Sequence, residues 1–156
     1  MRQRLIEALT AAVEHVFSVL CGIEAKPGGA VTGQPTSLPV DISGIVGIEG
    51  PITGSLAFHC RKDLATLITG KLLELEVTEI DDDVKDLVGE IANMIAGNAS
   101  SRLSGDGQGF QFSVPTIVTG RRLNVRPMRG DLRWISLPFQ ASGMSFAIDF
   151  CIEDGA

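Results

Sequence analysis

The segment DDDVKDLVGEIANMIAGNASSRL, residues 81–103, contains the longest helical pattern of the chain. At about 100° per residue, its apolar residues gather on one face, as in a helix that covers a hydrophobic core. These residues are Val84, Leu87, Val88, Ile91 and Ile95. Thr78, with Asp81 three residues later, predicts the start of the helix, and the glycine-rich residues 105–109 predict its end. We therefore expect a helix over 78–103.

The opposite face of this predicted helix carries polar and small residues. They are Asp86, Glu90, Asn93 and Gly97. By helix geometry they fall within about 60° of one another. Asn is a mediocre helix former, and Gly89 and Gly97 each cost roughly 1 kcal/mol relative to Ala in a helix interior. Two explanations stay open at this point: a solvated face that contains Glu-x-x-Asn by chance, or a face that another surface approaches closely.

Two further helices are predicted on the N-terminal side. Apolar residues at helical spacing extend over 2–20, and Gly22 follows as a stop signal. A second helix is expected over 61–76, with Asp63 near its start, where a carboxylate suits the free N–H groups. Its apolar side is expected to hold Leu64, Leu67, Ile68, Leu72 and Leu75.

Strand patterns occupy most of the remaining chain. β-Branched residues around Gly50-Pro51 predict a hairpin over 40–60, whereas the Gly-, Pro- and Ser-rich residues 26–39 predict a loop with at most one short strand. Later strand patterns lie at 110–118, near 123–125, at 134–139 and at 144–151, with a turn at Gly143. Clustered strands with short turns predict an α+β fold, an antiparallel β-sheet with helices packed on it. With no linker in view, we expect one domain over 1–156.

Length and composition exclude several classes of protein. The chain has 156 residues, a formal net charge of −6 and a hydrophobic fraction of 44%, which suffice for a core. The acidic balance argues against a nucleic-acid-binding protein. No apolar run reaches about 18 residues, so we expect no membrane span. The N-terminus also lacks the uninterrupted apolar segment of a secretory signal, so we expect a cytoplasmic protein.

The cysteines and histidines indicate neither a disulfide framework nor a metal site. Cys21, Cys60 and Cys151 are odd in number and far apart, and no Cys-x-x-Cys is present. His15 and His59 are expected to be packed or surface residues rather than catalysts. We therefore expect thiols in apolar surroundings and no metal or cofactor bound by this chain itself.

Other features have ordinary structural explanations. The glycines of 105–109 are not a P-loop, because no Gly-Lys-Ser/Thr follows, and Trp134 is expected in the core. The segment 74–90 holds eight carboxylates and one lysine. It is either a solvated face or a surface that attracts a partner electrostatically. The Arg-rich segment 121–133, RRLNVRPMRGDLR, is either an exposed hairpin or a docking surface for an acidic partner.

The motif Asp86-x-x-x-Glu90-x-x-Asn93, followed by Pro115, resembles the signature of the CheC/CheX/FliY family of chemotaxis phosphatases. Its surroundings, VGEIANMIAG at 88–97, are similar to the motif helix of that family. The interval from Asn93 to Pro115 contains 21 residues, one fewer than in the family pattern.

The resemblance extends over about residues 3–152. The segment VPTIVTG at 114–120 is similar to the strand that follows the family's motif helix. Neither Glu7 nor Glu14 is followed by Asn three residues later, so a single Glu-x-x-Asn is present, which is more similar to the CheX branch than to the CheC branch. The segment 121–133 is longer and more basic than expected from the family.

On its own chemistry the pair Glu90–Asn93 is no hydrolase site, because it offers no activated nucleophile and no set of metal ligands. The resemblance implies that a phosphorylated CheY-like response regulator supplies the aspartyl phosphate and Mg²⁺. It implies that Asn93 orients the attacking water and that Glu90 pairs with a lysine of the regulator. Asp86, Gly89 and Gly97 are expected to border this contact. The family also implies a homodimer formed through sheet contact.

Two alternatives stay open. One is a non-catalytic module, similar to flagellar switch domains, that docks a response regulator without hydrolysing its phosphate. The other is a small-ligand sensor domain in a signalling pathway. Exposure of Glu90 and Asn93 is the structural criterion, since burial or internal hydrogen bonds would remove both docking hypotheses.

Overall fold

The computed structural model describes residues 2–105, 109–123 and 132–153. The helices are α1 (Arg2–Val16), which runs directly into a π-helical turn (Phe17–Cys21), α2 (Lys62–Leu73) and α3 (Asp82–Ser104). The strands are β1 (Ala25–Pro27), β2 (Val31–Thr32), β3 (Val40–Glu49), β4 (Gly54–Cys60), β5 (Gln111–Phe112), β6 (Thr116–Leu123), β7 (Leu132–Ala141) and β8 (Met144–Glu153). Helix, hairpin, two helices and then strands follow one another as predicted.

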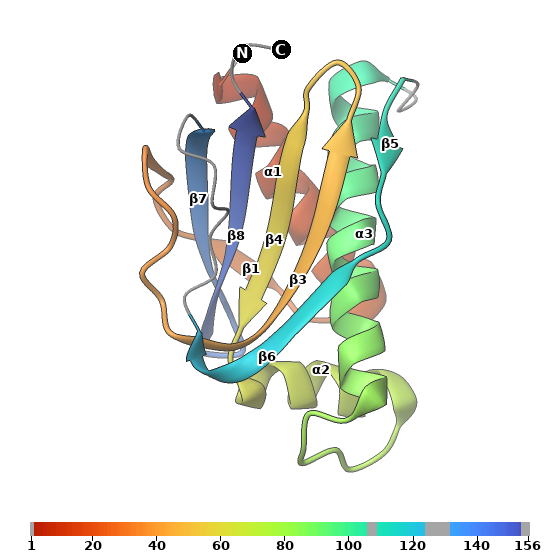
Figure 1. Cartoon of the computed structure of the whole chain (residues 1–156). Helices are drawn as coiled ribbons and strands as arrows, with labels where there is room; N and C mark the ends of the chain where they lie inside the picture. Colours follow the sequence, from red (N-terminus) through yellow and green to blue (C-terminus); the bar gives the residue numbers. More distant parts are fainter. Residues whose placement is uncertain (1, 106–108, 124–131, 154–156) are drawn as a thin grey trace.

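The strands pair into one antiparallel sheet (Figure 1). Within the described part of the chain it has eight strands, in the order β1-β7-β8-β4-β3-β5, and in addition β2 pairs with β7 and β6 pairs with β3. The hairpin predicted over 40–60 is β3–β4, with Ile42 opposite Cys60. The last hairpin is β7–β8, with Ala141 opposite Met144. The predicted α+β fold is confirmed.

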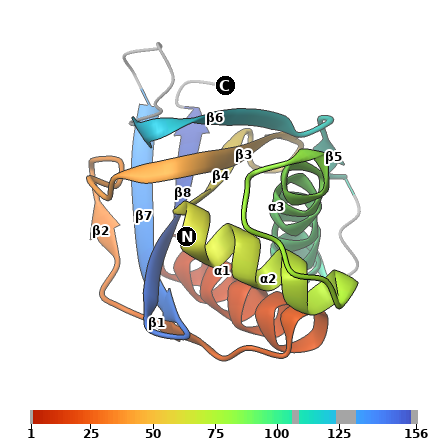
Figure 2. The same cartoon turned by 90° about the horizontal axis from the view of Figure 1, so that it is seen from below.

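The helices pack on one face of this sheet (Figure 2). Even-numbered residues of β3 and β4 point toward them, and fully buried examples are Ile42, Val46, Leu56 and Phe58. Phe17 stacks on Phe146 of β8 with ring centroids 4.7 Å apart. Gly44 lets α3 approach closely, because a Cβ there would lie 3.1 Å from Val88. Burial of each such large apolar side chain stabilises the fold by about 1.5–3 kcal/mol.

The ends of two predicted helices differ from expectation. The N-terminal cap of α3 is Asp81 rather than Thr78, and its side chain accepts a hydrogen bond from the Val84 N–H at 3.0 Å. Helix α2 ends at Leu73, because Glu74 adopts a left-handed conformation with φ of 56°. Leu72 and Leu75, which we expected on the apolar side, are 42% and 63% exposed. The helical spacing of apolar residues predicts a helix to residue 76, because spacing alone does not show where the backbone turns away from the core.

The sheet contains more strand breaks than predicted. Residues 26–39 contribute to two short strands, β1 and β2, which both pair with β7. The strand expected over 110–118 is divided into β5 and β6 by residues 113–115. Gly143, with φ of 76°, makes the predicted turn. Residues 124 and 125 of the strand expected near 123–125 lie outside the described residues, as does most of the Arg-rich segment.

Candidate functional site

Helix α3 is anchored along its whole length. Its core side is buried from Val84 to Ala99, and the helix packs against α1, β3 and β4. Asp82 and Asp83 occupy its first turn, where negative charge is favourable next to the positive end of the helix dipole. The side chains on its outer face therefore project from a well-supported platform, as a site that positions a reactant requires.

Glu90 and Asn93 lie on this outer face. Glu90 is exposed and Asn93 is half-buried. Within the described residues neither side chain makes a hydrogen bond or ion pair, whereas Asn98, just over one turn later, accepts a hydrogen bond from Arg102 Nε at 2.7 Å. The side chains of the pair are thus available to another molecule. This meets the criterion for docking stated above, that both side chains are neither buried nor held by internal hydrogen bonds.

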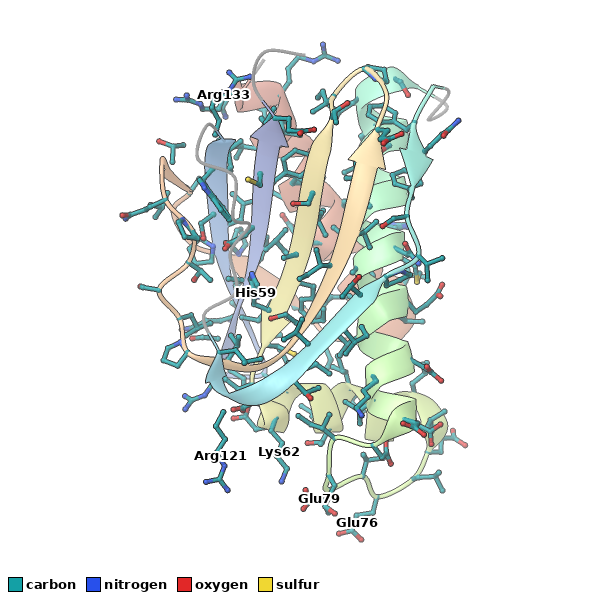
Figure 3. All side chains as sticks on the ribbon, viewed as in Figure 1. His59, Lys62, Glu76, Glu79, Arg121 and Arg133 are labelled. Atoms are coloured by element: carbon teal, nitrogen blue, oxygen red, sulfur yellow. The ribbon has the colours of Figure 1, made fainter. Side chains whose placement is uncertain are left out.

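Asp86 extends the pair toward the N-terminus of α3 and is exposed. Carboxylates at positions i and i+4 of a helix repel each other by about 0.2–0.5 kcal/mol. No ion pair to Asp86 or Glu90 is present in the described part of the chain. Lys62 Nζ, labelled in Figure 3, pairs instead with Glu79 Oε2 at 2.9 Å. The face therefore presents uncompensated negative charge to a partner.

The two glycines of the predicted contact surface have different surroundings. Gly89 is buried under β6, and a Cβ there would lie 3.3 Å from both Ile117 and Pro115. Its small size lets β6 approach α3, so Gly89 is packed inside the protein and does not border the partner contact as we expected. Gly97 has nothing within 4 Å of the corresponding point and is partly exposed, so it does lie on the open face.

A row of buried polar side chains crosses the outer face of the sheet and was not predicted as a group. His59, labelled in Figure 3, lies at the centre of the row. Ser43 Oγ lies 2.6 Å from His59 Nδ1, and His59 Nε2 lies 3.5 Å from Asp149 Oδ2. Asp149 Oδ2 also accepts a hydrogen bond from the Thr36 N–H at 3.0 Å. The three residue types match a hydrolase triad, but their exposed fractions of 0%, 2% and 2% leave no access for a substrate. The prediction that His59 is a packed histidine is confirmed.

The row was missed because its members lie far apart in the sequence. Ser43 is opposite His59 in the β3–β4 ladder, and Asp149 lies on the neighbouring strand β8. Only the strand register brings them together.

Trp134, expected in the core, is half-buried, and His15 is a surface residue of α1.

All three cysteines are buried free thiols, as predicted. Burial raises the pKa of Cys21 to about 11, an effect that Lys71 partly offsets, and raises the pKa of Cys151 to about 11, with a further contribution from Asp149. Burial, together with Asp63 and Asp41, also raises the pKa of Cys60 well above its ordinary value. These thiols are protonated at neutral pH and are unsuited to act as nucleophiles.

Neither a metal site nor a membrane-spanning helix is found among the described residues. No group of three or more His, Cys, Asp or Glu side chains there is placed to hold a metal ion. The helices of that same part of the chain are too short or too polar to cross a membrane. A cavity of about 470 Å³ lies between residues 26–38 and strands β7 and β8, at the opposite edge of the sheet from β6 and the Glu90–Asn93 pair.

Known proteins match the chain over most of its length. The family model described as chemotaxis phosphatase CheX matches residues 42–140. The CheY-P phosphatase CheX of Thermotoga maritima is 28% identical over 127 residues, which is 81% of this chain and 82% of that protein. The crystal structure of a CheC-like superfamily protein from Shewanella sp. PV-4 is 30% identical, with a TM-score of 0.89 over 98% of this chain and 99% of that one.

A more distant match is a structure of a CheX–CheY–BeF3–Mg²⁺ complex from Borrelia burgdorferi. It is 22% identical, with a TM-score of 0.78 over 96% of this chain and 97% of that one, which shows a shared fold. The family model, by contrast, covers more than half of the chain and includes α3 with its polar face. This chain belongs to the CheX family of chemotaxis phosphatases.

Proposed function

We propose that this chain is a phosphatase that accelerates hydrolysis of the aspartyl phosphate of a CheY-like response regulator. The observation that carries the proposal is the Glu90–Asn93 pair on the anchored helix α3, which is solvent-accessible and has no hydrogen-bond or ion-pair partner among residues 2–105, 109–123 and 132–153. Family membership supports the reaction, and the T. maritima relative is named for it. The B. burgdorferi complex shows that a protein of this fold binds CheY in the presence of Mg²⁺.

In the proposed mechanism Asn93 acts on the attacking water. An amide both donates and accepts hydrogen bonds, so it can align water without changing its own charge. The water oxygen forms a bond to phosphorus while the bond from phosphorus to the aspartyl oxygen breaks. The regulator recovers its carboxylate, and the water protons leave with inorganic phosphate and solvent. Alignment suits phosphoryl transfer, which depends on positioning and charge stabilisation more than on covalent chemistry.

Glu90 holds the complex in register by pairing with a lysine of the regulator. Asp86 and Gly97 border the contact, one as a charged rim and the other as an open surface next to the pair. Mg²⁺ belongs to the regulator in this scheme, where it neutralises charge on the phosphoryl oxygens. The chain then needs no cofactor of its own.

The experiment is a decay assay of a phosphorylated CheY-like regulator with and without the protein. Wild type is expected to accelerate decay, and Asn93→Ala is expected to lower the limiting rate by about 100-fold. Asn98→Ala is the matched control, because Asn98 also lies on α3 but is paired with Arg102. Undiminished activity of Asn93→Ala would overturn the role of Asn93. Tight binding without faster decay by wild type would favour the non-catalytic docking module.

We further propose the homodimer that the family implies. Strand β6 supports it, because within the described residues β6 pairs on one side only, with β3, and an unpaired strand edge is a template for pairing with another chain. Light scattering after gel filtration tests it, and a monomer at assay concentration contradicts it. The cytoplasmic location and the single domain over 1–156 remain predictions.

A further inference from the structure

Val114 is an apolar residue with an exposed fraction of 86%, in the segment that joins β5 to β6. An isolated exposed apolar residue is common in proteins and needs no explanation by itself. Val114 differs because the backbone on both sides of it is fixed and because of where it lies relative to the catalytic pair.

Ser113 fixes the backbone before Val114. The Ser113 N–H donates to the Gly47 carbonyl at 2.9 Å, and the Gly47 N–H donates to Ser113 Oγ at 2.8 Å. Because neighbouring side chains of an extended segment point to opposite sides, a Ser113 turned toward β3 leaves Val114 turned away from it. Pro115 fixes the backbone after it by packing on Gly89 of α3.

The segment runs alongside α3, as the β5–β6 connection in Figure 1 shows. Pro115 lies at the level of Gly89. Phe112 pairs with Ile48, which lines a small internal space with four residues of α3, of which Ala96 is the first in the chain, so Phe112 lies at the level of Ala96 or nearer the C-terminus of α3. Three extended residues and seven helical residues both span about 10 Å. Residues 112–115 therefore extend over about the same length as residues 89–96 of α3.

Val114 therefore lies close to the level of Ile91, about half a turn before Asn93. One extended residue beyond Pro115 corresponds to about two helical residues beyond Gly89. Helical side chains lean toward the N-terminus of their helix, so the side chain of Asn93 extends from its own backbone toward the level of Val114. Along the axis of α3, an exposed apolar side chain on a fixed backbone thus lies within about one turn of Asn93 and Glu90, whose side chains make no hydrogen bond or ion pair within the described residues.

We propose that Val114 is the apolar contact of the docking surface for the phosphorylated response regulator, at the rim of the regulator's phosphorylation pocket. This inference rests on the proposed function of Glu90 and Asn93. Stable interfaces surround a buried apolar contact with polar groups, and a desolvated neighbour strengthens the electrostatic interactions of the pair. Val114 acts by positioning the complex and does not touch the reacting atoms.

The experiment compares Val114→Ser, Val114→Leu and the control Val19→Ser. Val19 is also a strongly exposed valine, at 68%, but it lies on the π-helical turn after α1. The readouts are the concentration of phosphorylated regulator at half-maximal rate and the limiting rate. Val114→Ser is expected to raise the half-maximal concentration by about tenfold and to leave the limiting rate within twofold of wild type. Val114→Leu and Val19→Ser should behave like wild type.

Failure of this inference is distinguishable from failure of the proposed function. If wild type accelerates decay and Val114→Ser matches Val19→Ser in both readouts, the role of Val114 is overturned while the phosphatase stands. If wild type does not accelerate decay, the same variants are compared by binding to the regulator charged with BeF3 and Mg²⁺. Equal binding by Val114→Ser and Val19→Ser, or no binding by wild type, overturns the role of Val114 as well.

Discussion

At the residue scale, the proposed mechanism assigns a charge contact to Glu90 and the orientation of water to Asn93. Glu90 is exposed to solvent, where a carboxylate is stable without a partner, while Asn93 is half-buried. A neutral amide tolerates partial burial better than a carboxylate does, because its desolvation costs far less. This difference matches a role for Glu90 in contacting a cation and a role for Asn93 nearer the reacting atoms.

Replacement of Glu90 by Gln tests the charge separately from the shape. We expect Glu90→Gln to raise the half-maximal concentration of phosphorylated regulator by about tenfold, because a charge-assisted hydrogen bond becomes a neutral one. The limiting rate should stay within threefold of wild type. Salt should also weaken association of the wild type more than that of the variant. The control is Glu14→Gln on α1, an exposed glutamate outside the proposed surface, and equal effects of the two substitutions would contradict the role of Glu90.

At the element scale, α3 carries two glycines that serve opposite purposes. Gly89 admits Pro115 and Ile117 to the helix surface, and Gly97 leaves the surface open. Both lower helix propensity by the same amount, so the sequence alone treats them as equivalent. The two glycines differ because β6 packs on Gly89 and leaves Gly97 at the surface.

Alanine substitution at the two glycines should therefore give different stabilities. Gly97→Ala gains helix propensity of up to about 1 kcal/mol, equivalent to a rise in Tm of about 2–4 °C, because nothing obstructs the added methyl group. Gly89→Ala should be less stable than Gly97→Ala, since its methyl group must displace the Pro115 ring and Ile117. Thermal unfolding of both variants against wild type measures this, and an equal rise in Tm would contradict the close packing of β6 on α3.

At the scale of the whole molecule, the sheet has a helix-covered face and a face partly covered by residues 31–38. The proposed site lies on neither face but along the outer side of α3, where β6 joins it. The buried Ser43–His59–Asp149 row lies on the face of the sheet that points away from the helices. It connects β3, β4 and β8 with Thr36 of the covering segment. Its position, 0–2% exposed, gives it a structural role in the fold.

The buried thiols predict how the stability of the molecule depends on pH. In the unfolded chain these thiols ionise near the ordinary pKa of 9.0, while in the folded chain the pKa values of Cys21 and Cys151 are about 11. Between these values the unfolded state has lost protons that the folded state retains. The free energy of unfolding therefore has its full value, as far as these thiols contribute, below about pH 9. This contribution is lost as the pH rises through about 11.

Urea unfolding at about pH 8 and about pH 10.5 measures this effect. The free energy of unfolding should fall between the two values, and it should fall less in Cys151→Ala than in wild type. The comparison with Cys151→Ala removes the contributions of lysines and other groups that titrate in the same range. Identical pH slopes for the two proteins would contradict the burial of the Cys151 thiol.

Much of the fold was predictable because local patterns encode it. The apolar stripe of 81–103 requires only the 3.6-residue period of a helix, and the Gly50-Pro51 hairpin requires only β-branched residues around a turn. The same period predicted that Glu90 and Asn93 share an exposed face. Helix ends were less predictable, since Asp81 and Thr78 are both competent caps and the side-chain contact to Val84 decides between them.

The α+β class, the long helix and the polar pair on its outer side thus follow from local sequence patterns, because each depends on residues within a few turns of one another. Three other features emerge only from the folded chain: β6 covers Gly89, Val114 lies within about one turn of Asn93 along α3, and Ser43, His59 and Asp149 meet inside the protein. These relations join residues far apart in the chain, and they depend on strand register and on how β6 packs against α3. Periodicity in the sequence carries no record of either.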